Sequence, residues 1–335
     1  MALQHRPGLD IPSLDPAVQY YCSKGIAPST HQTYQSALKH FYSFCSLFNV
    51  ISPFPVSEDI LCYFASYLAT QNVSPQSIKT YLSGIRHTQV TLGLPEPRSF
   101  SSLPRLRLVH AGIQRTHLEQ ASKPSRTRLP ITPAILRAMQ STLEPRATDP
   151  AVIMIWAAAL LCFFGFFRSG EITTPNTTGF NPKIHLAWGD VAIDSPHSPS
   201  LLKIRLKRSK TDQFGQGVDI YVGKTGCPLC PVAGVTAYMV QRGSGEGPFF
   251  QFADRTPLTK ARFTEQIRAI LGDAGLPYSH FAGHSFRIGA ATAAANAGLE
   301  DSTIRTLGRW NSNAFLSYIR TPREQLASLT RCLAS

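Results

Sequence analysis

The chain has 335 residues, a formal net charge of +13 at pH 7 and 43% hydrophobic residues. This length favours two domains, and the apolar content excludes a chain that is disordered throughout. The excess of basic side chains favours a polyanionic partner but does not identify it. The seven cysteines are odd in number and lie in apolar contexts, which fits a reducing compartment better than a disulfide framework.

Neither a secretion signal nor a membrane span is expected. Residues 1–14 lack the apolar core of a signal peptide. The longest apolar run, 151–167, has 17 residues, which is just under the length of a membrane span. Because Arg168 and Glu171 follow directly and no aromatic belt flanks the run, we interpret it as a buried core helix. We expect no membrane partner and an intracellular location, which is the nucleus for a eukaryotic chain and the cytoplasm or nucleoid for a bacterial one.

The first part of the chain predicts a helical domain. Residues 1–28 hold four prolines and are expected to form a loose lead-in with at most a short helix. Residues 29–118 carry apolar side chains at helical spacing, which predicts four short helices that begin near residues 30, 57, 75 and 103. Residues 119–131 contain prolines and basic side chains and are expected to be an extended linker.

Basic side chains gather in the fourth of these helices and in the linker. Between Arg98 and Arg137 there are eight Lys or Arg residues and a single acid, Glu119. A solvated helix face and linker would explain this run as well as a surface that follows a DNA backbone. The candidate DNA-binding side chains here are Arg105, Arg107, Arg115, Lys123, Arg126 and Arg128.

The sequence of the second domain, 132–335, predicts helices together with a small sheet. Helices are expected to start at Thr132-Pro133 and Asp149-Pro150, where a capping side chain precedes a proline. Three apolar stretches separated by turn residues predict a small antiparallel sheet over 184–193, 201–206 and 218–222. The pattern is helical again after residue 232. The expected fold class is mainly α with a small antiparallel β-sheet, in two domains.

Three side chains near the C-terminus suit attack on a phosphodiester. Such attack needs a nucleophile, charge stabilisation on the non-bridging oxygens, an acid for the leaving oxygen and a rigid scaffold. Tyr318 offers the nucleophile, provided that nearby cations favour its phenolate. His284 and Arg287 lie three residues apart at the start of a predicted helix, where anions bind well. In isolation, a packing tyrosine, a capping histidine and a surface arginine would be the more common explanations.

Further charged side chains could complete this chemistry. Arg168 ends the most apolar helix, where an arginine is costly unless it is paired or binds an anion, and Glu171 is its natural partner. A structural ion pair would explain both residues equally well. Lys207, Arg208 and Lys210 precede an expected hairpin turn, which could place a lysine in a DNA groove beside a leaving 5′ oxygen, although most hairpin lysines are solvated. Lys207 and Arg208 are therefore also candidate DNA-binding residues.

Metal and cofactor chemistry is not expected. Cys227 and Cys230 form a lone Cys-x-x-Cys pair without a second pair or a well-spaced histidine, so a zinc site is disfavoured. The sequence matches no P-loop, dinucleotide fingerprint or metalloprotease helix. Acidic residues are too sparse for the clustered carboxylates of a two-metal nuclease.

Taken in order, these residues resemble a known family. The series matches the set that tyrosine recombinases, also called phage-integrase-like recombinases, use for catalysis: Arg168, Lys210, His284, Arg287, Trp310 and Tyr318. Residues 283–291 and 318–320 resemble the Cre subgroup, and 283–294 with 307–320 also resemble recombinases of eukaryotic DIRS- and Ngaro-type retrotransposons. Trp310 and Tyr318 are eight residues apart, whereas nine is usual for Cre- and Xer-like members.

The resemblance implies a site-specific DNA recombinase or integrase that needs no metal, cofactor or small-molecule substrate. Tyr318 would attack the scissile phosphate to give a 3′-phosphotyrosyl link and a free 5′ hydroxyl. Arg168 and Arg287 would hold the non-bridging oxygens. His284 and Trp310 would donate hydrogen bonds to the phosphoryl group, and the histidine could also accept the tyrosine proton.

The remaining roles follow from the same resemblance. Lys210 would protonate the leaving oxygen, with Lys207 as the second candidate, and Glu171 would orient the site of Arg168. Residues 29–118 would be a core-binding domain, 132–335 the catalytic domain, and the partner double-stranded DNA bound by a homo-tetramer. A helix over 322–333 would dock on a neighbouring subunit. The alternatives are a non-catalytic DNA-binding protein derived from a recombinase and a type IB topoisomerase-like relaxing enzyme.

Overall fold

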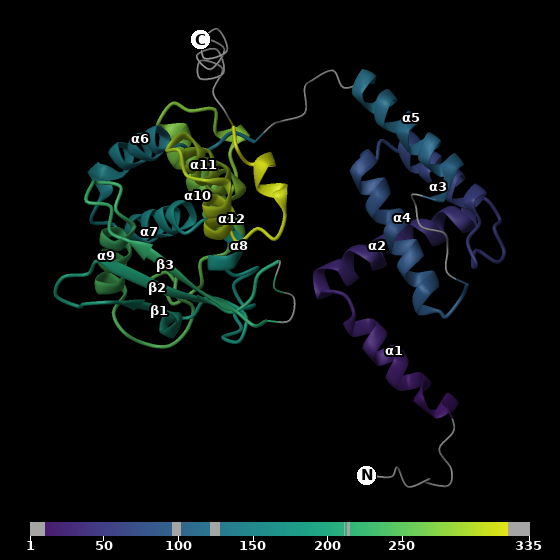
Figure 1. Ribbon diagram of the computed structural model, residues 1–335, viewed down its shortest axis with the longest axis horizontal. Coiled ribbons are helices and arrows are strands. Elements are labelled where there is room, and N and C mark those ends of the chain that lie inside the picture. Colours follow the sequence, from purple (N-terminus) through teal and green to yellow (C-terminus); the bar gives the residue numbers. More distant parts are fainter. Residues whose placement is uncertain (1–10, 96–101, 121–127, 211, 213–214, 321–335) are drawn as a thin grey trace. The chain divides into compact units, whose positions relative to one another are not determined.

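The structure is a computed structural model that describes residues 11–95, 102–120, 128–210, 212 and 215–320. The chain divides into two compact units, Met1–Ser125 and Arg126–Ser335. Figure 1 traces both units in sequence colours. Each unit has its own hydrophobic core, so each is described by itself.

The first unit is helical. It contains a short 3-10 helix, η1 (Ile11–Leu14), followed by α1 (Asp15–Lys24), α2 (Pro28–Leu47), α3 (Glu58–Thr70), α4 (Pro75–Thr91) and α5 (Pro104–Gln120). Ser57 and Ser74 cap α3 and α4, because each serine hydroxyl accepts a hydrogen bond from a backbone N–H in the first turn. Phe41, Phe44 and Phe64 form the aromatic centre of the core. The four predicted helices therefore correspond to α2 through α5.

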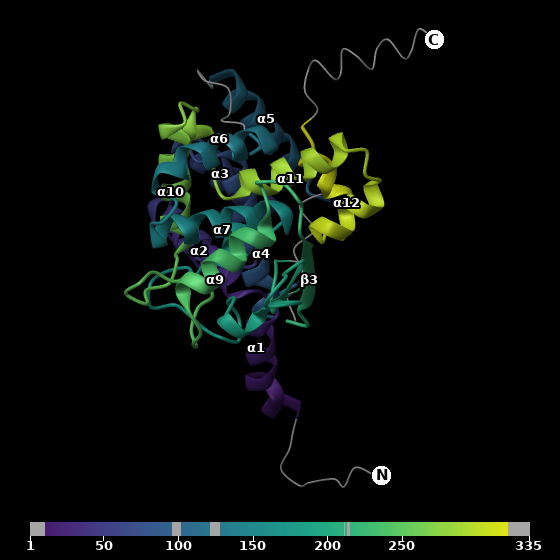
Figure 2. The ribbon, with the colours of Figure 1, turned by 90° about the vertical axis from the view of Figure 1, so that its left-hand side faces the viewer.

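The second unit contains the other elements. Its helices are α6 (Pro133–Leu143), α7 (Pro150–Phe164), α8 (Ser169–Ile172), α9 (Pro231–Arg242), α10 (Lys260–Asp273), α11 (His284–Asn296) and α12 (Asp301–Gly308). Its 3-10 turns are η3 (Glu144–Arg146), η4 (Trp188–Asp190), η5 (Tyr278–His280) and η6 (Asn313–Ser317). Figure 2 shows the same elements after a quarter turn, and α12 lies beside α11 in both views.

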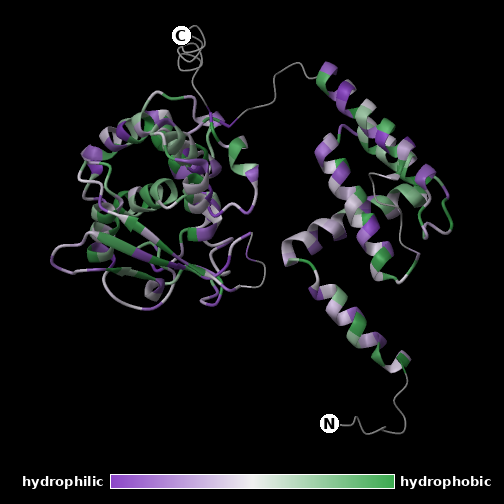
Figure 3. Cartoon of the chain, in the orientation of Figure 1, coloured by the Kyte–Doolittle hydropathy of each residue, from purple (hydrophilic) through white to green (hydrophobic). Residues whose placement is uncertain are grey.

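A three-stranded antiparallel sheet lies within this unit. The strands β1 (Val191–Ile193), β2 (Leu201–Leu206) and β3 (Val218–Gly223) are hydrogen-bonded in that order. The register pairs Val191 with Ile204, and Ile204 with Ile220. Apolar residues make up most of β1 and β2, and in β2 the residues alternate between buried and exposed positions (Figure 3). The predicted fold class, mainly α with a small antiparallel sheet, is confirmed.

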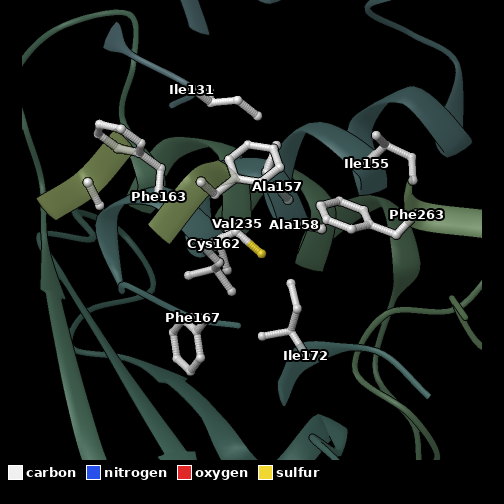
Figure 4. Packing of buried hydrophobic residues seen from close by; sticks show 14 of the residues in the cluster. Ile131, Ile155, Ala157, Ala158, Cys162, Phe163, Phe167, Ile172, Val235 and Phe263 are labelled. Carbon is white, nitrogen blue, oxygen red and sulfur yellow. The ribbon is translucent and has the colours of Figure 1, made fainter. Parts of the chain in front are cut away.

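Helix α7 is the centre of the second core. Ten of its fifteen residues are buried, and it packs against α9 and α11. Figure 4 shows Ala157, Cys162 and Phe163 of α7 among side chains from neighbouring segments, such as Val235 and Phe263. The apolar run is thus a core helix, as predicted. Among the described residues, no helix is both long and apolar enough to cross a membrane.

The small residues of α11 allow a close approach to the segment that enters α6. A Cβ added to Gly289 would lie 1.8 Å from the carbonyl oxygen of Ile131, so only glycine fits there. The Ile131 N–H donates a hydrogen bond to the carbonyl oxygen of Ser285 at 2.9 Å. This contact fixes the first turn of α11, which carries two candidate site residues.

Candidate active site

The candidate site is built from four segments of the second unit. They are the turn between α7 and α8, the first turn of α11, the segment that ends α12, and the residues after η6. Direct contacts join His284, Arg287, Trp310 and Tyr318, and the ion pair of Arg168 and Glu171 lies close enough for its charges to act on Arg287, so the structure brings together six of the predicted site residues. These segments are up to 150 residues apart in the sequence, so only the tertiary fold assembles the site.

Arg287 is the buried centre of this site. Its side chain is 0% exposed and donates hydrogen bonds to the carbonyl oxygens of Phe166 and Gly308. Its guanidinium carbon lies 4.2 Å from the ring centroid of Trp310 and 5.9 Å from that of Tyr318, within the range of cation–π attraction. Burial and neighbouring arginines lower the pKa of Arg287 to about 9, so the guanidinium is still protonated at pH 7. Arg287 is therefore a fixed positive charge beneath the two aromatic rings.

Three of the five buried side-chain atoms that have no hydrogen-bond partner among the described residues belong to the candidate site. They are Nε of Arg287, Nε of Arg309 and the indole Nε1 of Trp310. Buried donors in folded proteins are almost always paired, because an unpaired donor costs about 1–3 kcal/mol. Arg287 and Trp310 are predicted phosphate-binding residues. Their state fits a site that takes up an oxygen-rich group.

Arg168 and Glu171 form the predicted ion pair at the entrance to α8. Arg168 Nη1 lies 2.6 Å from Glu171 Oε1, and the backbone N–H of Arg168 donates to Oε2 at 2.9 Å. The arginine side chain is 20% exposed, whereas that of the glutamate is 6% exposed. The carboxylate thus holds Arg168 at the edge of the site, where it can meet a ligand from solvent.

Tyr318 lies directly against the other site residues. Its ring centroid is 4.8 Å from that of His284 and 5.0 Å from that of Trp310. Its carbonyl oxygen accepts a hydrogen bond from the Thr292 hydroxyl of α11 at 3.3 Å, and that hydroxyl also accepts the N–H of Arg320 at 3.0 Å. The backbone around Tyr318 is therefore tied to the helix that carries His284.

His284 begins α11 near four basic side chains. Partial desolvation is the largest cause that lowers its pKa, followed by the charges of Arg287, Arg168, Lys210 and Lys260. Because the lowered value lies below 6.5, the imidazole is neutral at pH 7 and can accept a proton.

The pKa of His284 can be measured directly. In an NMR titration of the ring protons we expect His284 to gain its proton only below pH 6.5. Arg168→Gln and Lys210→Ala should each raise this pKa, because each removes a positive charge that opposes protonation. A pKa at or above 6.5 in the unaltered protein, or no response to either substitution, would show that the ring does not face these charges.

The two hairpin lysines occupy different environments. Lys210 is exposed and lies close enough to His284 for its charge to lower the pKa of the histidine. Lys207 Nζ is held by Asp190 Oδ2 at 2.5 Å and donates to the carbonyl oxygens of Pro182 and His185. These contacts favour Lys210 over Lys207 as the side chain that can reach a bound substrate. Residues 211, 213 and 214 lie outside the described part.

The other predicted DNA-binding residues are divided between the two units of the chain. Arg105 pairs with Asp59, whereas Arg107 and Arg115 are exposed on α5. Arg128 is exposed and donates to the carbonyl oxygen of Ser279 at 3.1 Å. Arg208 lines a cavity of about 390 Å³ together with Lys183, Arg205 and Lys207. Lys123 and Arg126 lie outside the described residues.

Neither cysteine of the Cys-x-x-Cys pair belongs to a metal centre in the described part of the chain. Cys230 caps α9, where its sulfur accepts the N–H of Ala233 at 3.4 Å, and Cys227 is exposed beside Thr225. No group of three or more His, Cys, Asp or Glu side chains within the described ranges could hold a metal ion.

Two basic residues of the site were missed by the sequence analysis. Lys260, the first residue of α10, lies near the site because its charge acts on His284 and its side chain passes close to Gly170. Arg309 is 12% exposed and shares the Glu171 carboxylate with Arg168. The position of Arg309 directly before Trp310 was the signal that could have drawn attention to it.

Comparison with known proteins adds one curated relative. No family model matches the chain. An integrase/recombinase xerD homolog from Selenomonas ruminantium is 28% identical over 163 residues. The match covers 47% of this chain and 43% of that protein, so it spans less than half the length of the relative.

Solved structures of similar fold cover nearly the whole chain. The XerH recombinase bound to palindromic difH substrate, in a post-cleavage complex, has a TM-score of 0.60 at 14% identity, with 96% of this chain and 85% of that chain covered. A lambda integrase dimer bound to a COC′ core site has a TM-score of 0.56 at 15% identity, covering 93% and 96%. The Tn1549 transposon integrase in complex with circular intermediate DNA has a TM-score of 0.55 at 13% identity, covering 93% and 98%. The resemblance seen in the sequence is therefore confirmed, and the chain has the fold of the tyrosine recombinases.

Proposed function

We propose that this chain is a site-specific DNA recombinase or integrase that cleaves and rejoins strands through a 3′-phosphotyrosyl intermediate without a metal ion. The observation that carries the proposal is the contact of the Tyr318 ring with His284 and Trp310 above the buried charge of Arg287. A phenol, a neutral imidazole and a guanidinium in this arrangement supply a nucleophile, a proton acceptor and charge stabilisation.

In the cleavage step, Tyr318 Oη attacks the scissile phosphorus and passes its proton to His284. The bond from phosphorus to the 5′ oxygen breaks, and that oxygen takes a proton from Lys210. Arg168 contacts a non-bridging oxygen from the edge of the site. The buried donors of Arg287 and Trp310 form hydrogen bonds to the phosphoryl oxygens and stabilise the negative charge that develops on them. Rejoining reverses these steps with a 5′ hydroxyl as nucleophile, so the energy of the broken bond is retained and no nucleotide is consumed.

Tyr318 acts on the phosphate bound by its own subunit. Its ring already contacts His284 of the same chain, and its backbone is tied to α11 through Thr292. The 3-10 turn η6 lies between Trp310 and Tyr318 and bridges their eight-residue spacing in this arrangement. Delivery of the tyrosine to a neighbouring subunit would require these contacts to break.

The partner is duplex DNA, and the active assembly is a homo-tetramer. The net charge of +13 supports binding to a polyanion, and the solved structures of similar fold include complexes with DNA and a dimer. The segment 322–333, which we propose docks on a neighbouring subunit, lies outside the described residues. The enzyme acts in the compartment that contains the DNA, which is the nucleus of a eukaryotic cell or the cytoplasm or nucleoid of a bacterium.

The proposal is tested by trapping the covalent intermediate. The protein is incubated, with EDTA present, with a library of nicked duplexes that have a randomised centre, since a nick near the cleavage site releases the short strand and prevents rejoining. After denaturation, we expect DNA linked covalently to protein, and sequencing of the linked DNA identifies the site. Tight, salt-sensitive binding without a covalent adduct would instead indicate a non-catalytic DNA-binding protein. Relaxation of supercoiled DNA without paired sites would indicate a topoisomerase-like enzyme.

The role of Lys210 predicts a rescue that depends on the leaving group. We expect Lys210→Ala to slow adduct formation about 10²–10⁴-fold, the usual contribution of a general acid. A substrate with sulfur in place of the bridging 5′ oxygen needs no proton for departure, so on it the variant should react within about tenfold of the wild type. Lys207→Ala is the matched control, because Lys207 is held by Asp190. If the sulfur substrate restores the rate of Lys207→Ala but not that of Lys210→Ala, Lys207 is the side chain that protonates the leaving oxygen.

A further inference from the structure

Arg309 occupies a position where an arginine is unexpected. It ends α12 in the left-handed backbone region, with φ of +56°, where a residue with a side chain costs about 1–2 kcal/mol relative to glycine. Its side chain is only 12% exposed, so its charge also has to be compensated by other bonds. A glycine could end the helix without either cost. The arginine side chain must therefore contribute something that a helix end alone does not require.

The Arg309 guanidinium connects two segments of the site. Nη1 donates to the carbonyl oxygen of Gly165 at 3.0 Å, and Nη2 donates to the carbonyl oxygen of Phe166 at 3.0 Å and to Glu171 Oε2 at 3.3 Å. Phe166 is itself left-handed, with φ of +51°, within the turn that leads from α7 to Arg168. Arg309 thus fastens the segment before Trp310 to the turn that carries Arg168.

Two of the bonds made by Arg309 share an acceptor residue with another arginine of the site. The carbonyl oxygen of Phe166 also accepts a hydrogen bond from Arg287 Nη1. The Glu171 carboxylate also accepts two hydrogen bonds from Arg168, one from its side chain and one from its backbone. A displacement of Arg309 would therefore change the positions of Arg168 and Arg287, the two arginines that we propose to act on the phosphate.

We infer that Arg309 is a positioning residue for strand cleavage, which sets Arg168 through the shared Glu171 carboxylate and Arg287 through the shared Phe166 carbonyl. This inference rests on the proposed function. Arg309 need not touch the DNA, and its contribution comes from the fork of the guanidinium, which bonds three carbonyl oxygens and a carboxylate at once. A lysine keeps the charge but has a single nitrogen, so it cannot reproduce this geometry.

The first test compares Arg309→Met and Arg309→Lys with the wild type in single-turnover adduct formation, on a nicked duplex recovered from the randomised library. We expect both variants to slow adduct formation about 10²-fold, the cost of a misplacement of about 1 Å in an active site. The DNA dissociation constant should stay within about threefold, because the Arg309 side chain is only 12% exposed and is bonded within the protein. Arg305→Met, at an exposed position on the same helix, is the matched control and should react like the wild type.

A second substrate separates positioning from a merely structural role. A methylphosphonate at the cleavage position lacks one anionic oxygen, so the reaction no longer depends on an arginine that stabilises charge there. If Arg309 acts by placing Arg168, the rate loss in Arg309→Met should shrink from about 10²-fold to less than about tenfold on this substrate. Equal losses on the two substrates would indicate general damage to the fold and would overturn the inference.

If Arg309→Met does not fold, Arg309→Lys still tests the inference. A wild-type rate in Arg309→Lys would show that charge alone suffices and would refute the positioning role. If the wild type itself forms no adduct, the proposed function fails and the inference falls with it. If the wild type forms an adduct and the Arg309 variants form it equally fast, only the inference fails.

Discussion

We expect Tyr318→Phe to abolish the covalent adduct with nicked DNA and to leave the DNA dissociation constant within about twofold of the wild type. The substitution removes only the phenolic oxygen, which is the atom that becomes bonded to phosphorus. The ring keeps its contacts with His284 and Trp310, at 4.8 and 5.0 Å between centroids, so the site keeps its shape. The adduct is measured on a denaturing gel and the dissociation constant by fluorescence anisotropy at one fixed salt concentration, since salt alone changes affinity.

The matched control for this experiment is Tyr221→Phe. Tyr221 lies in β3 and is 59% exposed, outside the candidate site, so its loss should change neither the adduct nor the affinity. An adduct that persists in Tyr318→Phe would show that a different side chain attacks the phosphate. Proteolysis of the trapped adduct and mass measurement of the DNA-linked peptide would then identify that side chain.

The pattern of the sequence predicted those parts of the fold that depend on local periodicity and capping. Proline preceded by a capping side chain marked the starts of α6 and α7, and the alternation in 201–206 marked β2. The three-residue spacing of His284 and Arg287 also placed both at the start of one helix, α11. These features depend on neighbours within a few residues, so a single sequence contains them.

The environment of the charged residues could not be predicted in the same way. Taken alone, Arg287 was expected to be a surface side chain. It is instead fully buried, and its charge is compensated by a hydrogen bond to the carbonyl oxygen of Phe166, 121 residues away in the sequence. Lys207 and Arg105 were expected to meet DNA, but each forms an ion pair with an acid that is distant in the sequence. Arg309 was not predicted because its left-handed backbone and its bonds to distant segments leave no sequence signal, and only its position before Trp310 pointed to it. Ion pairs and hydrogen bonds between residues distant in the sequence determine which charged side chains can bind a ligand. A local sequence pattern contains no information on these contacts.

Removal of Arg287 should have the second large effect, on stability and on cleavage together. Arg287→Met removes the Arg287 hydrogen bonds to the carbonyl oxygens of Gly308 and Phe166, of which Phe166 keeps only its bond from Arg309, so we expect the free energy of unfolding to fall by about 2–5 kcal/mol. The variant also loses the buried charge beneath Tyr318, so adduct formation should fall about 10³-fold or more in folded protein. Urea denaturation and single-turnover adduct formation measure the two effects separately.

Arg287→Lys and a matched arginine elsewhere separate the two contributions. Arg287→Lys keeps a charge but bonds only one of the two carbonyls, so it should be more stable than Arg287→Met and still cleave slowly. Arg242 is the control, because it also stacks on a tryptophan, with 4.5 Å to the Trp188 ring, and also donates to backbone carbonyls. Arg242→Lys should lose stability without a loss of the cleavage rate in folded protein. If Arg287→Lys behaves in the same way, Arg287 is a structural residue, and the charge on the phosphate must be stabilised by other side chains of the site, such as Arg168.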